Sequence, residues 1–80
     1  MTLDETPIGA LVSVLTLGGE RQFRRRIMEL GLLPGTAVRV LRVAPLGDPI
    51  EVETRGCHLS IRHAEARRIT VAAAKDNASS

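Results

Sequence analysis

The sequence has almost no aromatic side chains. It contains one phenylalanine, Phe23, and no tryptophan or tyrosine among its 80 residues. The core of such a chain has to be built from valine, leucine, isoleucine and alanine, and β-branched residues pack well on pleated strands. The same shortage argues against a polyproline groove and against a base-stacking platform, because aromatic rings line both kinds of site. The composition therefore favours a β-rich fold.

Cysteine is also scarce, since Cys57 is the single one. A secreted domain of this size commonly carries several disulfides, so one cysteine favours the reducing cytosol. The first residues lack the basic and apolar regions of a signal peptide, and no apolar run approaches the roughly 20 residues of a membrane span. We expect one cytoplasmic domain over residues 1–72 and a disordered tail over residues 73–80.

The excess of positive over negative charge is small. Eleven basic and nine acidic residues give a formal net charge of +2, and ten of the eleven basic residues are arginine. Arginine suits planar pairing with carboxylates or phosphates. A net charge of +2 falls short of the basic footprint of a nucleic-acid-binding domain, so nucleic acid is not the expected partner.

Short stretches of alternating apolar and polar residues predict five strands, at residues 10–17, 36–44, 50–55, 57–62 and 68–71. Between Val40 and Leu41 the alternation changes phase, which predicts a bulge of the kind that closes small barrels. Arg55-Gly56 is typical of a hairpin turn. Together with one helix, these strands predict a mainly β (α+β) fold, a small and partly open five-stranded barrel.

The one convincing helix spans about residues 20–30 and is inserted after the first strand, with Gly19 as its N-cap. Its apolar stripe, at i, i+4 and i+7, consists of Phe23, Ile27 and Leu30. The opposite face carries Arg21, Arg24, Arg25 and Met28. Opposite charges four residues apart predict the ion pairs Glu20–Arg24 and Arg25–Glu29.

The end of this helix has a recognisable signal. Gly31 fits the left-handed position after the last turn, and Leu32 is then expected to return to Ile27 in a Schellman motif. Pro34-Gly35 fits the centre of a type II turn.

Residues capable of catalysis or metal binding are few. Cys57 alternates in phase with Leu59 and Ile61, so we expect it to be a small core residue rather than a nucleophile. His58 and His63 stand five residues apart at a strand end, without the spacing of a zinc site. No glycine-rich loop has the pattern of a nucleotide site. We therefore predict no catalytic, cofactor or metal residues, and a protein that is not an enzyme.

Three segments carry a family resemblance: MELGLLPGT at residues 28–36, APLGDPI at residues 44–50 and IRHAEARRITV at residues 61–71. In this order they resemble the FeoA family, over about residues 2–72. The resemblance implies an SH3-like barrel that serves as the small cytosolic component of bacterial ferrous-iron uptake. Its implied partner is FeoB, a membrane permease with a cytosolic GTP-binding domain, which would recruit the chain to the inner face of the membrane. In this setting Glu65 is expected to pair with Arg62 or Arg68.

The hypothesis that follows is an accessory protein that regulates a FeoB-type permease by binding its cytosolic part. Exposed apolar residues rimmed by arginine are typical of an interface. The candidate partner-binding residues are Arg21, Arg24, Arg25, Met28, Leu33, Pro45, Leu46 and Asp48. The alternative is a regulatory or nucleic-acid-associated barrel related to the C-terminal domain of iron-dependent transcriptional repressors. A fused helix-turn-helix would support it, and the sequence has only one full helix.

Overall fold

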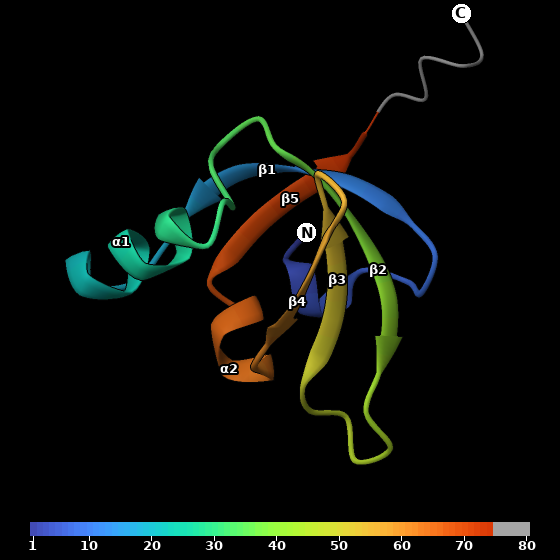
Figure 1. Cartoon of the computed structure of the whole chain (residues 1–80). Helices are drawn as coiled ribbons and strands as arrows, with labels where there is room; N and C mark the ends of the chain where they lie inside the picture. Colours follow the sequence, from blue (N-terminus) through green and yellow to red (C-terminus); the bar gives the residue numbers. More distant parts are fainter. Residues whose placement is uncertain (75–80) are drawn as a thin grey trace, which may run out of the picture.

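The computed structural model describes residues 1–74. Its strands form one antiparallel sheet in the order β4-β3-β2-β1-β5, which curls around the core (Figure 1). The elements in chain order are η1 (Leu3–Glu5), β1 (Leu11–Leu17), α1 (Arg21–Glu29), β2 (Ala37–Val43), β3 (Ile50–Thr54), β4 (Cys57–Ile61), α2 (His63–Ala66) and β5 (Ile69–Ala73). The predicted five strands and one main helix are confirmed.

The β3–β4 hairpin shows how local sequence determines structure here. Arg55 and Gly56 have φ angles of 53° and 79°, as the two central residues of a type I′ turn require. Along β3 the side chains of Ile50, Val52 and Thr54 are buried and alternate with half-buried glutamates. The turn therefore sets the register, and the alternation decides which face of the strand meets the core.

The phase change predicted in the second strand is a real irregularity. The β2–β3 register shifts between Val40 and Arg42, so Leu41 adds one residue to the ladder and bends the strand. A second shift, between Val14 and Thr16 in the β1–β5 pairing, was not predicted, although the alternation changes phase there too, between Val14 and Leu15. These irregularities increase the twist that lets a short sheet curl.

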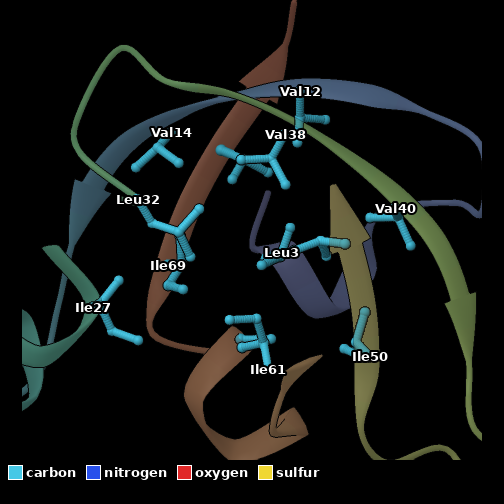
Figure 2. Close-up of a cluster of buried hydrophobic side chains, with 13 residues drawn as sticks. Leu3, Val12, Val14, Ile27, Leu32, Val38, Val40, Ile50, Ile61 and Ile69 are labelled. Atoms are coloured by element: carbon cyan, nitrogen blue, oxygen red, sulfur yellow. The ribbon is translucent and has the colours of Figure 1, made fainter. Parts of the chain in front are cut away.

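The core is aliphatic and draws on nearly every element (Figure 2). Leu3 of η1 and Ile27 of α1 enter it from outside the sheet, together with Leu32 from the α1–β2 connection. The remaining members are Val12, Val14, Val38, Val40, Ile50, Val52, Ile61, Ala66, Ile69 and Val71. Phe23, the one aromatic residue, packs only partly against this core.

The end of α1 has the predicted Schellman geometry. Gly31 adopts a φ of 102°, its N–H donates to the carbonyl of Met28 at 2.9 Å, and the N–H of Leu32 donates to the carbonyl of Ile27 at 3.2 Å. Both Ile27 and Leu32 are fully buried, so the motif joins the helix end to the core. The turn at Pro34-Gly35 is also confirmed, since the N–H of Thr36 donates to the carbonyl of Leu33 at 2.9 Å.

Cys57, predicted to lie in the core, is exposed. It is the first residue of β4, which is an edge strand, and burial rises along that strand from Cys57 through half-buried Leu59 to buried Ile61. Cys57 therefore lies beyond the rim of the core. Alternation identifies a face of a strand, but it does not show where the core ends along that face.

Two predicted boundaries also differ. The helix runs over Arg21–Glu29 with Glu20, not Gly19, as its N-cap, and Leu30 is its C-cap. In that position the Leu30 side chain is 43% exposed, so it does not complete the apolar stripe. Ala73, assigned to the tail, is the last residue of β5. Residues 75–80 of the predicted tail lie outside the described residues.

Leu32 and Leu33 are adjacent leucines with opposite surroundings, the first fully buried and the second 40% exposed. We expect Leu32→Ala to lower the free energy of unfolding by about 3 kcal/mol, because it leaves a cavity in the core. Leu33→Ala should cost less than about 1 kcal/mol. Urea unfolding followed by far-ultraviolet circular dichroism measures both, and equal losses would contradict the assigned burial.

A capping box forms at the start of the chain. Glu5 Oε1 accepts the Thr2 N–H at 2.9 Å, and this backbone hydrogen bond, helped by the Thr2 hydroxyl, lowers the pKa of Glu5. Because the folded pKa lies below the unfolded one, the bond stabilises the fold above the unfolded pKa. That contribution disappears as the pH falls through the folded pKa.

A pH titration of the side-chain carboxyl by ¹³C NMR should therefore place the pKa of Glu5 below the ordinary glutamate value. The variant Glu5→Gln should remove that part of the acid dependence of stability. A Glu5 carboxyl that titrates at the ordinary value would show that the capping bond does not persist in solution.

Candidate protein-interaction site

The helix α1 is joined to the barrel by a small number of contacts. Ile27 is its one buried residue, and Phe23 is partly packed on the core, with the Arg68 guanidinium 5.5 Å from its ring centroid. A third attachment is an ion pair between Arg26 and Glu65, the latter from α2. Figure 1 shows α1 projecting at one end of the molecule, so most of its surface faces solvent.

The partner of Glu65 was predicted wrongly. Its carboxylate pairs with Arg26 rather than with the Arg62 or Arg68 side chain, while its Oε1 atom accepts the backbone N–H of Arg62 at 3.1 Å. Glu65 thus starts α2 as the third residue of a capping box and also links α2 to α1. A partner 39 positions away gives no signal in a local sequence pattern, whereas the two arginines that were predicted lie within three residues.

On the outer face of α1 the four predicted residues do not play the same part. Arg21, Arg25 and Met28 are exposed. Arg24 is partly buried and donates to the Gly19 carbonyl at 2.6 Å, so it supports the start of the helix. Among residues 1–74 neither predicted pair, Glu20–Arg24 or Arg25–Glu29, occurs as an ion pair.

Three exposed apolar side chains surround the C-terminal end of α1. Met28, Leu30 and Leu33 are 40%, 43% and 40% exposed. Leu30 is the residue that periodicity missed, because the stripe assigned it to the core. We use the term α1 surface for Arg21, Arg25, Met28 and Leu33, which combine arginine charge with exposed leucine and methionine. Leu30 lies on the opposite side of the helix from Arg21, Arg25 and Met28 and is not part of this surface.

The other predicted residues lie on the β2–β3 loop, which protrudes well away from α1 (Figure 1). Leu46 at its tip is 96% exposed, and Pro45 and Asp48 are exposed as well. The loop is braced at its base, where the Ala44 N–H donates to the Pro49 carbonyl at 3.0 Å. The Asp48 carboxylate accepts the backbone N–H of His63 at 3.0 Å, so it ties the loop to α2. The predicted set therefore divides into two separate surfaces.

The two histidines are the side chains that a metal ion would most readily bind. His58 Nε2 lies 3.3 Å from Glu53 Oε2, and His63 Nε2 lies 3.5 Å from Asp4 Oδ2, so each histidine has one acidic neighbour. Within residues 1–74, no three His, Cys, Asp or Glu side chains gather closely enough to hold a metal ion. The same residues contain no helix with the length and apolarity to cross a membrane.

The FeoA domain model matches residues 1–73 of the chain. The chain belongs to the FeoA family. FeoA proteins are associated with ferrous-iron transport, and an Fe(2+) transport protein A/Fe(2+) transporter FeoB fusion protein of Porphyromonas gingivalis is 32% identical over 80 residues. These residues are all of this chain and 10% of the fusion protein.

Solved FeoA structures share the fold. The FeoA protein from Chlorobium tepidum matches with a TM-score of 0.86 and 46% identity, over 91% of this chain and 70% of that one. The FeoA of Stenotrophomonas maltophilia, described as a prokaryotic SH3 domain protein and solved with zinc, matches with a TM-score of 0.78 and 30% identity, over 90% of this chain and 89% of that one. The predicted SH3-like barrel of the FeoA family is thus confirmed.

The relationship to repressors is one of fold alone. A manganese-dependent transcriptional repressor aligns with a TM-score of 0.84, but at 19% identity and over 41% of its own length. That likeness agrees with the barrel that the sequence resemblance implied, and it carries no function to this FeoA chain.

The two roles of Glu65 can be separated by substitution. Glu65→Ala removes both the cap and the ion pair, and we expect it to cost about 1 kcal/mol of stability. Glu65→Gln keeps an oxygen for the Arg62 N–H and loses only the charge, so it should cost less than about half as much, since Arg26 is 60% exposed. Thermal unfolding at low and high salt measures both. Equal losses of stability in the two variants at low salt would show that the ion pair, not the cap, is the main contribution of Glu65 to stability.

Proposed function

We propose that this chain is an accessory protein of bacterial ferrous-iron uptake, which works in the cytoplasm by docking on the cytosolic part of a FeoB-type transporter and regulating it. It acts through its surface, without making or breaking a covalent bond. One observation carries the proposal: the fusion protein of Porphyromonas gingivalis, 32% identical over the whole chain, holds the corresponding domain and the FeoB transporter in one polypeptide. A domain linked to a transporter contacts it at high effective concentration.

The α1 surface is the part of the chain that we assign to this docking. Interfaces are enriched in methionine and arginine and have an apolar centre with a polar rim. Met28 and Leu33 are the apolar members, each 40% exposed. Arg21 and Arg25 provide positive charge and, among the described residues, pair with no acidic side chain. An acidic, partly apolar patch on the transporter is the complementary partner.

A capture experiment tests the docking. Tagged native chain is incubated at moderate salt with membranes containing the FeoB-type transporter of the same organism, beside the variant Arg21→Glu/Arg25→Glu. Arg24 is left unchanged because it bonds to the Gly19 carbonyl. We expect capture by the native chain and at least a tenfold loss with the variant, because charge reversal opposes an acidic partner surface.

The matched control is Arg42→Glu/Arg67→Glu, which makes the same change in net charge at two other exposed arginines. Circular dichroism confirms that each variant is folded. Loss with both double variants would indicate a dependence on overall charge and would reject the α1 surface. Loss with Leu46→Asp alone would place the interface on the β2–β3 loop, and no capture by the native chain would reject the transporter as the partner.

A further inference from the structure

The strand β4 lies at an edge of the sheet, and no described strand pairs with its outer side. The opposite edge, β5, is covered by the start of the chain. Thr2 forms an antiparallel bridge with Thr70, and the Val71 N–H donates to the Met1 carbonyl at 2.8 Å. In the part of the chain that the structure describes, β4 is therefore the edge left open for a further strand.

The register shows which backbone groups point outward from β4. The two-residue turn makes Thr54 and Cys57 a hydrogen-bonded pair, and Val52–Leu59 and Ile50–Ile61 follow at alternate positions. His58 and Ser60 therefore direct their N–H and C=O groups away from β3. Both residues are exposed, and no backbone hydrogen bond from another described segment reaches them.

The two ends of this strand carry positive charge. Arg55 lies in the turn before β4 and Arg62 directly follows it, and both are exposed. Neither side chain pairs with an acidic group among residues 1–74. A pocket at the Arg62 end is lined by Asp48, Pro49, Ser60 and Arg62. The Asp48 carboxylate accepts the His63 N–H and keeps its negative charge, so Arg62 is the basic side chain of a pocket that also contains an acidic one.

A second copy of the chain fits this edge poorly. Antiparallel pairing of two β4 strands with His58 opposite Ser60 of the other copy would place Arg62 beside the Arg55 of that copy. In this register Arg62 is opposite Gly56 of the other copy and one position from its Arg55, so like charges approach each other at both ends, which is unfavourable. Charged flanks are a common protection of edges against self-pairing. The same two arginines favour a strand with acidic residues near both ends.

We propose that β4 accepts an extended segment of a partner protein as a sixth strand. The segment hydrogen-bonds to the backbone of His58 and Ser60, and acidic side chains near its ends pair with Arg55 and Arg62. This mode of recognition draws affinity from main-chain bonds and selectivity from side chains at fixed spacing. It involves neither the α1 surface nor a transporter, so it stands independently of the proposed function.

The test uses a capped eight-residue peptide of alternating valine and threonine with glutamate at each end, added to the ¹⁵N-labelled chain. We expect amide shifts that centre on β4 and hydrogen exchange at His58 and Ser60 that slows several-fold. Two matched peptides serve as controls, one with lysine at both ends and one with the backbone N-methylated on the pairing side. Each should bind at least tenfold more weakly.

Two variants complete the test. Ser60→Pro removes one outward N–H from an edge position, where proline is tolerated, and should weaken binding at least tenfold. Arg55→Glu/Arg62→Glu should reverse the preference in favour of the lysine-ended peptide. If Ser60→Pro does not fold, the N-methylated peptide makes the same test on the native chain.

Several results would overturn the proposal. They are equal binding of the N-methylated peptide, shifts centred on α1, and no shifts at millimolar concentrations of the glutamate-ended peptide. Slowed exchange at His58 that depends on protein concentration alone would also overturn it, because the occupant would then be a second copy of the chain.

Discussion

The burial of Ile27 and Leu32 in one aliphatic core is the contact on which the arrangement of this protein depends. The two side chains are joined by the backbone bond from the Leu32 N–H to the Ile27 carbonyl, and both are inaccessible to solvent. This contact fixes the end of α1 against the barrel and the start of the connection to β2. With aromatic residues almost absent, packing of this aliphatic core has to hold a helix that otherwise touches the barrel through Phe23 and Arg26.

Because that attachment uses one side of a short helix, the rest of α1 is available to a partner. Helices buried on one stripe present their other faces to water, and here those faces carry Arg21, Arg25 and Met28. The link between Arg26 and Glu65 adds orientation rather than much stability, since exposed ion pairs contribute little. The proposed docking surface is thus a consequence of how little of the helix is buried against the barrel.

The fold could be predicted from the sequence because its signals are local. Alternation located the strands, the phase change at Val40 and Leu41 located a bulge, and Gly31 located the end of the helix. The wrong predictions concern features that a short stretch of sequence does not determine. Cys57 follows the inward alternation but lies past the rim of the core, Leu30 follows the helical stripe but caps the helix, and Glu65 finds its partner on another element.

The sequence could predict which types of residue form the candidate site, but not where on the molecule they lie. Arg21 and Leu46 both fit the composition of an interface, yet the fold puts them on surfaces far apart, and Arg24 proves to be part of the helix start. The open edge of β4 could not be foreseen, because strand order is a property of the whole sheet. Once that order is known, arginines that are scattered along the sequence can be placed on the molecule. Arg21 and Arg25 lie on α1, and Arg55 and Arg62 lie at the ends of β4. The two docking surfaces that we propose, on α1 and on the β4 edge, are therefore built on one core and use different residues.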